Sequence, residues 1–206
     1  MAQVFGIKTK EVTASFDKGL IYLMNEGCKL ISLEDAARLR VKYGINSDFC
    51  RKMLIVREGF VSIPGVGDYL TKKSPIIMRA KQATARHKNE EEFYPHDYLS
   101  KEQIRRILDE DSGNAIQILE ENISTARFEN SELAVFAFGD FAGEYGDFLR
   151  RNGVDEIAVF VPGQTSRMFA RQVTLAKINN SYDSAIDCDR RELHLPTKMY
   201  GVVSSD

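Results

Sequence analysis

The sequence predicts an α/β or α+β fold, in which a helical, basic N-terminal part precedes a mixed sheet with a parallel βαβ core and a C-terminal antiparallel hairpin. Two nearly unbroken apolar runs, Glu132–Phe138 and Glu156–Val161, have the length of strands. A continuous apolar run is typical of a strand that is covered on both faces. Further along, Phe169–Ile178 alternates between apolar and polar residues, which favours a strand of a hairpin.

The segment between the two apolar runs predicts the crossover helix of the βαβ unit. Its apolar residues recur at helical spacing, with Asp140 as the expected N-cap and Gly153 as the expected residue after the helix. Residues 139–154 are long enough for a crossover between parallel strands, and such crossovers are right-handed. The apolar stripe consists of Phe141, Tyr145, Phe148 and Leu149.

Helical spacing and capping residues predict a short strand and three helices near the N-terminus. Each helix follows a polar capping residue or stops at a glycine, which are the usual signals for a helix start and end. The elements are a strand at Gln3–Lys8, then helices at Glu11–Glu26 before Gly27, at Leu33–Tyr43 between Ser32 and Gly44, and at Ser47–Val56 after Asn46.

The middle of the chain predicts shorter elements and a domain boundary. We expect a strand or extended arm, a turn, a short helix that starts at Asp68 and stops before Pro75, a loop or solvated helix, and two further helices. The boundary divides the chain into residues 1–90 and 91–206, unless the two form one continuous domain. The remaining elements are Glu58–Ile63, the turn Pro64–Asp68, the loop or solvated helix Lys81–Glu92, a helix from the capping box at Ser100 to about Glu110, and a helix at Ala115–Ile123.

The last part of the chain predicts antiparallel strands. After Phe169–Ile178, Asn179 and Asn180 form the expected turn, and Tyr182–Asp187 begins the return strand. Leu193–Val203 adds another strand, bent at Pro196.

Composition and charge limit the functional classes. The chain has 206 residues and a net charge of −2, yet residues 1–88 carry +8 and residues 89–206 carry −10. This asymmetry indicates either an anionic partner for the basic half or attraction between the halves inside one domain. No apolar run approaches the roughly 18 residues of a membrane span, and the first residues lack the pattern of a signal peptide, so we expect a cytoplasmic protein. Three widely spaced cysteines predict neither a disulfide framework nor a zinc site.

The stretch Ile63–Lys73 resembles the hairpin of the helix-hairpin-helix motif, in which Pro-Gly-hydrophobe-Gly opens a second helix. The resemblance implies that Gly65 and Gly67 present backbone N–H groups to a nucleic-acid phosphate at a helix N-terminus. Lys72 and Lys73 add positive charge one turn later. The alternative is a tight turn between a strand and a short helix.

The residues from Ser32 to Leu54 are similar to a helix-turn-helix unit. Gly44 makes the turn, and Arg51 and Lys52 point outward from the second helix toward a groove or phosphates. The alternative is an ordinary pair of helices joined by a short loop.

A basic run follows these two segments and completes the candidate interface. We expect a cytoplasmic nucleic-acid-binding protein that contacts the phosphate backbone through its basic N-terminal half, without a cofactor or metal. The alternatives are a metal-dependent enzyme that uses carboxylates of the α/β domain, and a protein–protein assembly factor with a homo-oligomeric or protein partner. The carboxylate candidates are Asp187, Asp189 and Glu192 beside His194. The candidate nucleic-acid-binding residues are Arg51, Lys52, Gly65, Gly67, Lys72, Lys73, Arg79, Lys81, Arg86 and Lys88.

Overall fold

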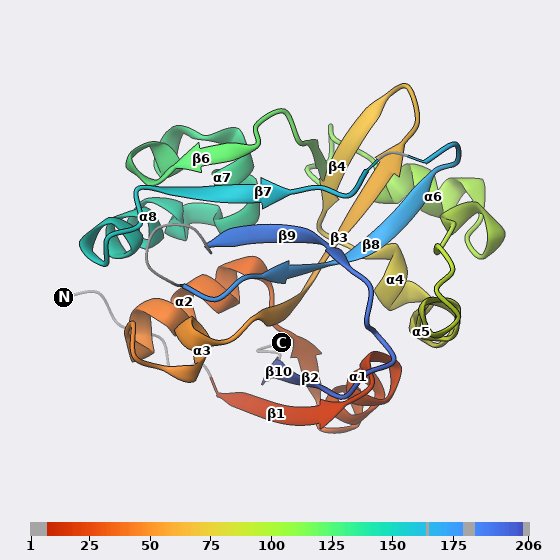
Figure 1. Ribbon diagram of the computed structural model, residues 1–206, viewed down its shortest axis with the longest axis horizontal. Coiled ribbons are helices and arrows are strands. Elements are labelled where there is room, and N and C mark those ends of the chain that lie inside the picture. Colours follow the sequence, from red (N-terminus) through yellow and green to blue (C-terminus); the bar gives the residue numbers. More distant parts are fainter. Residues whose placement is uncertain (1–7, 164, 179–183, 204–206) are drawn as a thin grey trace.

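Two β-sheets form the framework of the protein, as seen in a computed structural model that describes residues 8–163, 165–178 and 184–203 (Figure 1). Within these ranges the fold is mixed α/β, with one seven-stranded and one three-stranded sheet. The strands are β1 Thr9–Ala14, β2 Cys28–Leu30, β3 Leu54–Ile63, β4 Gly67–Thr71, β5 Ala115–Gln117, β6 Asn122–Ser124, β7 Glu156–Phe160, β8 Phe169–Leu175, β9 Ala185–Arg190 and β10 Thr197–Val203.

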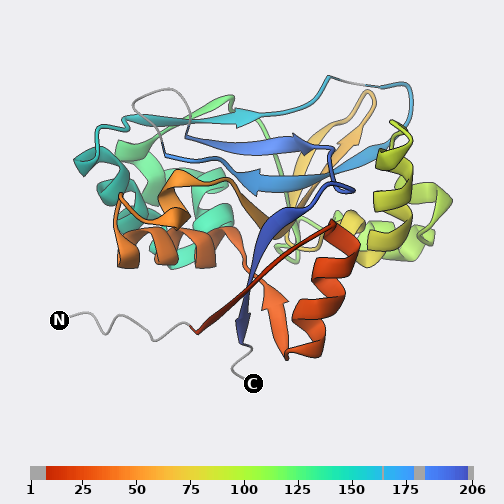
Figure 2. The same cartoon turned by 60° about the horizontal axis from the view of Figure 1, so that its bottom comes forward.

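Helices connect these strands and cover the large sheet on one side. Figure 2 shows α2, α3 and α8 beneath the large sheet, while α1 lies against the small sheet. The α-helices are α1 Phe16–Asn25, α2 Leu33–Tyr43, α3 Asp48–Arg51, α4 Pro75–Met78, α5 Ala80–Lys88, α6 Lys101–Ile107, α7 Glu132–Phe138 and α8 Ala142–Arg151. Three 3₁₀ turns are η1 Pro95–Asp97, η2 Thr125–Asn130 and η3 Gly139–Phe141.

The large sheet has the strand order β5-β4-β3-β8-β9-β7-β6, and the small sheet has the order β1-β10-β2. Among the described strands, β7 and β9 are parallel and all other paired strands are antiparallel. Strands from both sides of residue 90 meet in the large sheet, and the division into 1–90 and 91–206 stays a prediction. Within the described residues, none of the helices has the length and apolar character that a bilayer crossing requires.

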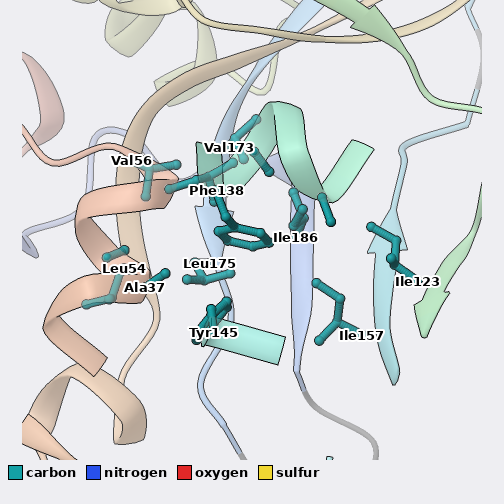
Figure 3. Close-up of a cluster of buried hydrophobic side chains, with 14 of the residues drawn as sticks. Ala37, Leu54, Val56, Ile123, Phe138, Tyr145, Ile157, Val173, Leu175 and Ile186 are labelled. Atoms are coloured by element: carbon teal, nitrogen blue, oxygen red, sulfur yellow. The ribbon is translucent and has the colours of Figure 1, made fainter. Parts of the chain in front are cut away.

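The main core lies between the large sheet and helices α2, α7 and α8 (Figure 3). Phe138 stacks on Phe128 with ring centroids 5.7 Å apart, and Tyr145 packs against both rings. The buried guanidinium of Arg40 donates hydrogen bonds to the Tyr145 hydroxyl and to the Phe49 carbonyl, both at 2.9 Å. A charged side chain therefore joins α2 to α8 inside an otherwise apolar core.

The strand predicted at Glu132–Phe138 is wrong, because this segment forms helix α7. Ser131 caps the helix by accepting a hydrogen bond from the Ala134 N–H. The buried residues recur with helical spacing, whereas Val135 between them is exposed. The parallel βαβ core predicted here is therefore absent, and Asp140 lies in η3 instead of capping a helix. The predicted crossover helix is present as α8, and Gly153 follows it with φ +79°.

Three further predictions are corrected by the structure. Glu11–Glu26 contains the end of β1 and then α1, so only its second part is helical. The helix predicted at Ser47–Val56 ends at Arg51, and the chain then enters the buried strand β3. Ala115–Ile123 forms β5 and the start of β6, because its apolar residues pair with neighbouring strands.

Several predicted elements are confirmed. Ser32 and Ser100 both form capping boxes at the start of α2 and α6. Gly27 and Gly44 end α1 and α2 with positive φ, and Lys81–Glu92 is largely the helix α5. The antiparallel pairing of β8 with β9 and the strand β10 are present. The predicted turn at Asn179–Asn180 and most of the strand at Gln3–Lys8 lie outside the described residues.

The helix-hairpin-helix prediction is also wrong in its secondary structure. Residues 64–66 form the turn of a β-hairpin in which Ile63 of β3 pairs with Gly67 of β4. No helix starts at Asp68, which instead pairs with Ser62 in the ladder. Gly65 does adopt a positive φ of +72°, so the turn itself was placed correctly. The helix-turn-helix arrangement likewise lacks a full second helix, since α3 has only four residues.

Candidate functional site

A groove separates α1 and β2 from the segment that carries α4 and α5. Its volume is about 600 Å³, which is within the usual size range of small-molecule sites. Helix α1 packs beside α5, and both helices lie toward the lower right of Figure 1. The lining is mostly aliphatic. It includes Leu20, Leu23, Met24, Leu30, Ile77 and Met78.

The lining also carries positive charge. Five cationic side chains line the groove, against a single acid, Asp17. They come from three separate parts of the chain, namely β2, β3 and residues 72–81. The cations are Lys29, Arg57, Lys72, Lys73 and Lys81.

These cations differ in how their charge is already used. The Lys72 ammonium donates a hydrogen bond to the Phe136 carbonyl and lies 4.5 Å from the centre of the Phe136 ring. Arg57 Nε lies 3.7 Å from a carboxylate oxygen of Glu58. Lys73 and Lys81 are exposed and form no ion pair with any residue in the described ranges. These two side chains are therefore available to an anionic ligand at the groove.

A close approach between β3 and the β4–α4 link holds one wall of the groove. A Cβ atom on Gly59 would lie 2.6 Å from the Cα atom of Ser74, so a larger residue would push this link away. The Ser74 hydroxyl donates to Gln172 Oε1 at 3.1 Å and also caps α4. Thr71 Oγ1 lies 3.2 Å from the Lys73 carbonyl. The backbone at Lys73 is therefore positioned by the large sheet.

Glu58 lies fully buried behind this wall. Its Oε2 atom accepts a hydrogen bond of 2.9 Å from the Leu33 N–H at the start of α2. Burial raises the pKa of the Glu58 carboxyl to about 7, and the neighbouring Arg57 charge opposes this rise. Burial lowers the pKa of Lys72, while the Glu58 carboxylate acts in the opposite direction. The groove thus has a titratable acid beneath its cationic rim.

A second cavity of about 410 Å³, the polar cavity, lies where the end of α5 meets β8 and the chain after β9. Its lining includes Arg171, whose side chain is 1% exposed and pairs with Glu92 and Asp189. Arg191 also pairs with Asp189, at 3.0 Å. Burial, together with the Arg171 charge, lowers the pKa of His87 to about 4. The cations of this cavity are therefore already neutralised by carboxylates of the same chain.

The structure brings only part of the predicted nucleic-acid interface together. Lys72, Lys73 and Lys81 meet at the groove, whereas Gly65 and Gly67 lie at the β3–β4 turn. The other predicted residues are held elsewhere. Lys52 pairs with Asp48, Arg51 bonds to Asn46, Arg79 donates to the Tyr98 carbonyl, Arg86 donates to the Glu92 carbonyl, and Lys88 lies exposed at the end of α5.

Sequence reasoning missed Lys29, Arg57 and the apolar contribution of α1. The sequence of α1 contains one signal for the groove. Its apolar residues are not confined to the single stripe that would pack against the core. Ile21 and Met24 are 58% and 74% exposed, although both are large and apolar. An exposed apolar patch of this kind is characteristic of a binding surface.

The carboxylates proposed for a metal-dependent enzyme are engaged in other contacts. Asp189 pairs with the two arginines, Glu192 pairs with Arg190, and Asp187 accepts a hydrogen bond from the Asp189 N–H. Among the described residues there is no cluster of three or more potential ligands from His, Cys, Asp and Glu that is arranged to hold a metal ion.

Comparisons with known proteins identify a similar fold but no family. No protein-family model matches the chain, and no curated protein matches its sequence. The chain is similar to a solved structure described as "Accommodation of massive sequence variation in Nanoarchaeota by the C-type lectin fold", with a TM-score of 0.68 and 11% sequence identity. The likeness covers 97% of this chain and 100% of that one. At this level of identity it shows the fold alone.

Proposed function

We propose that the protein is a non-catalytic binding protein that holds an anionic ligand in the groove between α1 and the α4–α5 segment. The observation that carries this proposal is the combination of an aliphatic lining with Lys73 and Lys81, whose charges are not paired within the described residues. A cation beside apolar surface attracts an anion more strongly than it does in bulk water, because the local dielectric constant is lower.

Two further features support this proposal. Arg57 and Lys72 also line the groove and add positive potential there, which favours the approach of an anion. The structural neighbour is described in terms of a fold that accommodates massive sequence variation. For this chain, that description is compatible with a scaffold whose core sets the fold and whose surface residues select the ligand.

A dye-binding experiment tests the proposal. The probe is 1-anilinonaphthalene-8-sulfonate, an anion with an apolar body, titrated into the native full chain. The double variant Lys73→Ala/Lys81→Ala is expected to bind the dye about 5–10-fold more weakly, because two exposed charge contacts are lost. The matched control Lys42→Ala/Lys101→Ala removes the same charge from α2 and α6 and should bind like the parent. Equal affinity in all three proteins would reject the groove as the site.

Nucleic acid is the second candidate ligand, as the sequence predicts. The specific observation in its favour is a row of exposed lysines. They are Lys73 in the β4–α4 link, Lys81 at the start of α5 and Lys88 at its end. Fluorescence anisotropy of a labelled single-stranded oligonucleotide at several salt concentrations tests this candidate. Three phosphate contacts predict a slope of log K against log salt of about −2. Absence of binding at low salt would remove nucleic acid as a ligand.

A further inference from the structure

The geometry points to a single-chain aliphatic acid as the ligand of the groove, held with its hydrocarbon chain against α1 and its acidic head beside Lys73 and Lys81. This inference rests on the proposed anion-binding function and narrows it to one chemical class. It follows from the kind of side chain that lines the groove, from the exposure of that lining, and from the number of accessible cations at the rim.

The lining is suited to a hydrocarbon chain. Among the described residues that line the groove, none is aromatic, and leucine, isoleucine and methionine provide the apolar surface. Nucleobases are usually held by stacking on aromatic rings, which this lining does not offer. Met24 and Met78 have unbranched, flexible side chains that adapt to a chain of variable shape.

Part of the apolar surface of the groove is exposed to water, and a bound aliphatic chain would cover it. Ile21 and Met24 of α1 are among the most exposed large apolar residues that the structure describes. Removing such surface from water is favourable in proportion to its area. A ligand chain lying along α1 would therefore gain affinity with each added methylene.

The rim limits the size of the anionic head. Lys73 and Lys81 are exposed and form no ion pair within the described residues, whereas Lys29, Arg57 and Lys72 already interact with other groups. The charge of these two ammonium groups suits one small anionic head, such as a carboxylate or a sulfate. They do not match the repeated phosphates of a polymer, which need a longer track of cations.

Calorimetric titration of the full chain with dodecanoate, octanoate and dodecanol tests the inference. Dodecanoate is expected to bind one-to-one. Its affinity should exceed that of octanoate, by at most about fourfold for each extra methylene. Dodecanol should bind at least about fivefold more weakly than dodecanoate, because it lacks the charge that the two lysines recognise.

Two variants and one control locate the hydrocarbon chain and the acidic head of the ligand. Ile21→Glu places a carboxylate on the exposed face of α1 and should weaken dodecanoate binding by tenfold or more. Leu119→Glu makes the same change at a residue that is 80% exposed outside the groove, and should bind like the parent. Lys73→Ala/Lys81→Ala should remove the preference for dodecanoate over dodecanol.

The outcomes separate the inference from the proposed function. If the anionic dye binds in a lysine-dependent way but dodecanoate does not bind, or binds without dependence on chain length, the inference is wrong and the proposed function stands. If neither probe binds, both are wrong. Anionic phosphatidylglycerol vesicles provide a second arm. Co-sedimentation with these vesicles, without one-to-one binding of dodecanoate, would overturn the inference in favour of a lipid surface.

Discussion

The groove and the polar cavity are both lined by cationic side chains, yet they use them in opposite ways. In the polar cavity, Arg171 is buried and its charge is matched by Glu92 and Asp189. At the groove, Lys73 and Lys81 are exposed and not paired within the described residues. The difference shows that positive side chains are available to bind a ligand only where the fold keeps acidic side chains away from them.

The largest expected difference between the two regions concerns stability. Arg171→Met should lower the free energy of unfolding by about 3 kcal/mol, because Glu92 and Asp189 lose their buried partner and Asp189 keeps only its exposed pair with Arg191. The matched control Arg167→Met breaks the exposed pair with Asp97 and should cost less than about 1 kcal/mol. Urea unfolding of both variants measures the effects. Similar small losses would mean that Arg171 does not hold the polar cavity together.

The two regions should also respond to pH in opposite directions. Glu58, behind the groove, has a folded pKa of about 7, above its ordinary value. Its stabilising contribution is therefore complete below about pH 4.5 and is lost as the pH rises toward 7. The loss amounts to about 3 kcal/mol. Glu58→Gln keeps the acceptor for the Leu33 N–H and should abolish this loss, as unfolding measurements at pH 4.5 and 7.5 would reveal. An unchanged pH dependence in the variant would contradict the assignment.

His87 in the polar cavity should show the reverse behaviour. Its folded pKa of about 4 lies below its ordinary value, so its contribution is complete above about pH 6.5 and is lost as the pH falls toward 4. The expected loss is about 2–3 kcal/mol. His87→Gln should be less sensitive to acid than the parent in the same measurements. A variant that loses stability as steeply as the parent would show that His87 is not the titrating group.

The smallest effect on stability is expected at the groove. Lys73→Ala/Lys81→Ala should change the free energy of unfolding by less than about 0.5 kcal/mol, because exposed, unpaired lysines contribute little to folding. The same variant should lose affinity for an anionic probe. A stability loss above about 1 kcal/mol would indicate that the two lysines stabilise the fold. It would contradict the difference between the groove and the polar cavity.

Local signals in the sequence predicted a large part of the secondary structure. The cap at Ser32, the capping box at Ser100 and the glycine after α2 placed helix ends correctly, because these interactions involve residues close in sequence. The antiparallel pair β8 and β9 was also predicted from period-two alternation. The run Glu132–Phe138 was assigned to a strand because unbroken apolarity does not distinguish a buried strand from a buried helix.

The candidate site was only partly predictable. The sequence by itself identified Lys72, Lys73 and Lys81 as members of a basic run, and it determined the charge asymmetry of the chain. Only the tertiary structure decided which of these charges are accessible. Folding brings Arg86 beside Glu91, while it brings Arg57 and β2 to the same groove as Lys73. Capping and periodicity act over a few residues, whereas charge pairing and groove formation depend on contacts between distant segments, and no local pattern specifies those contacts.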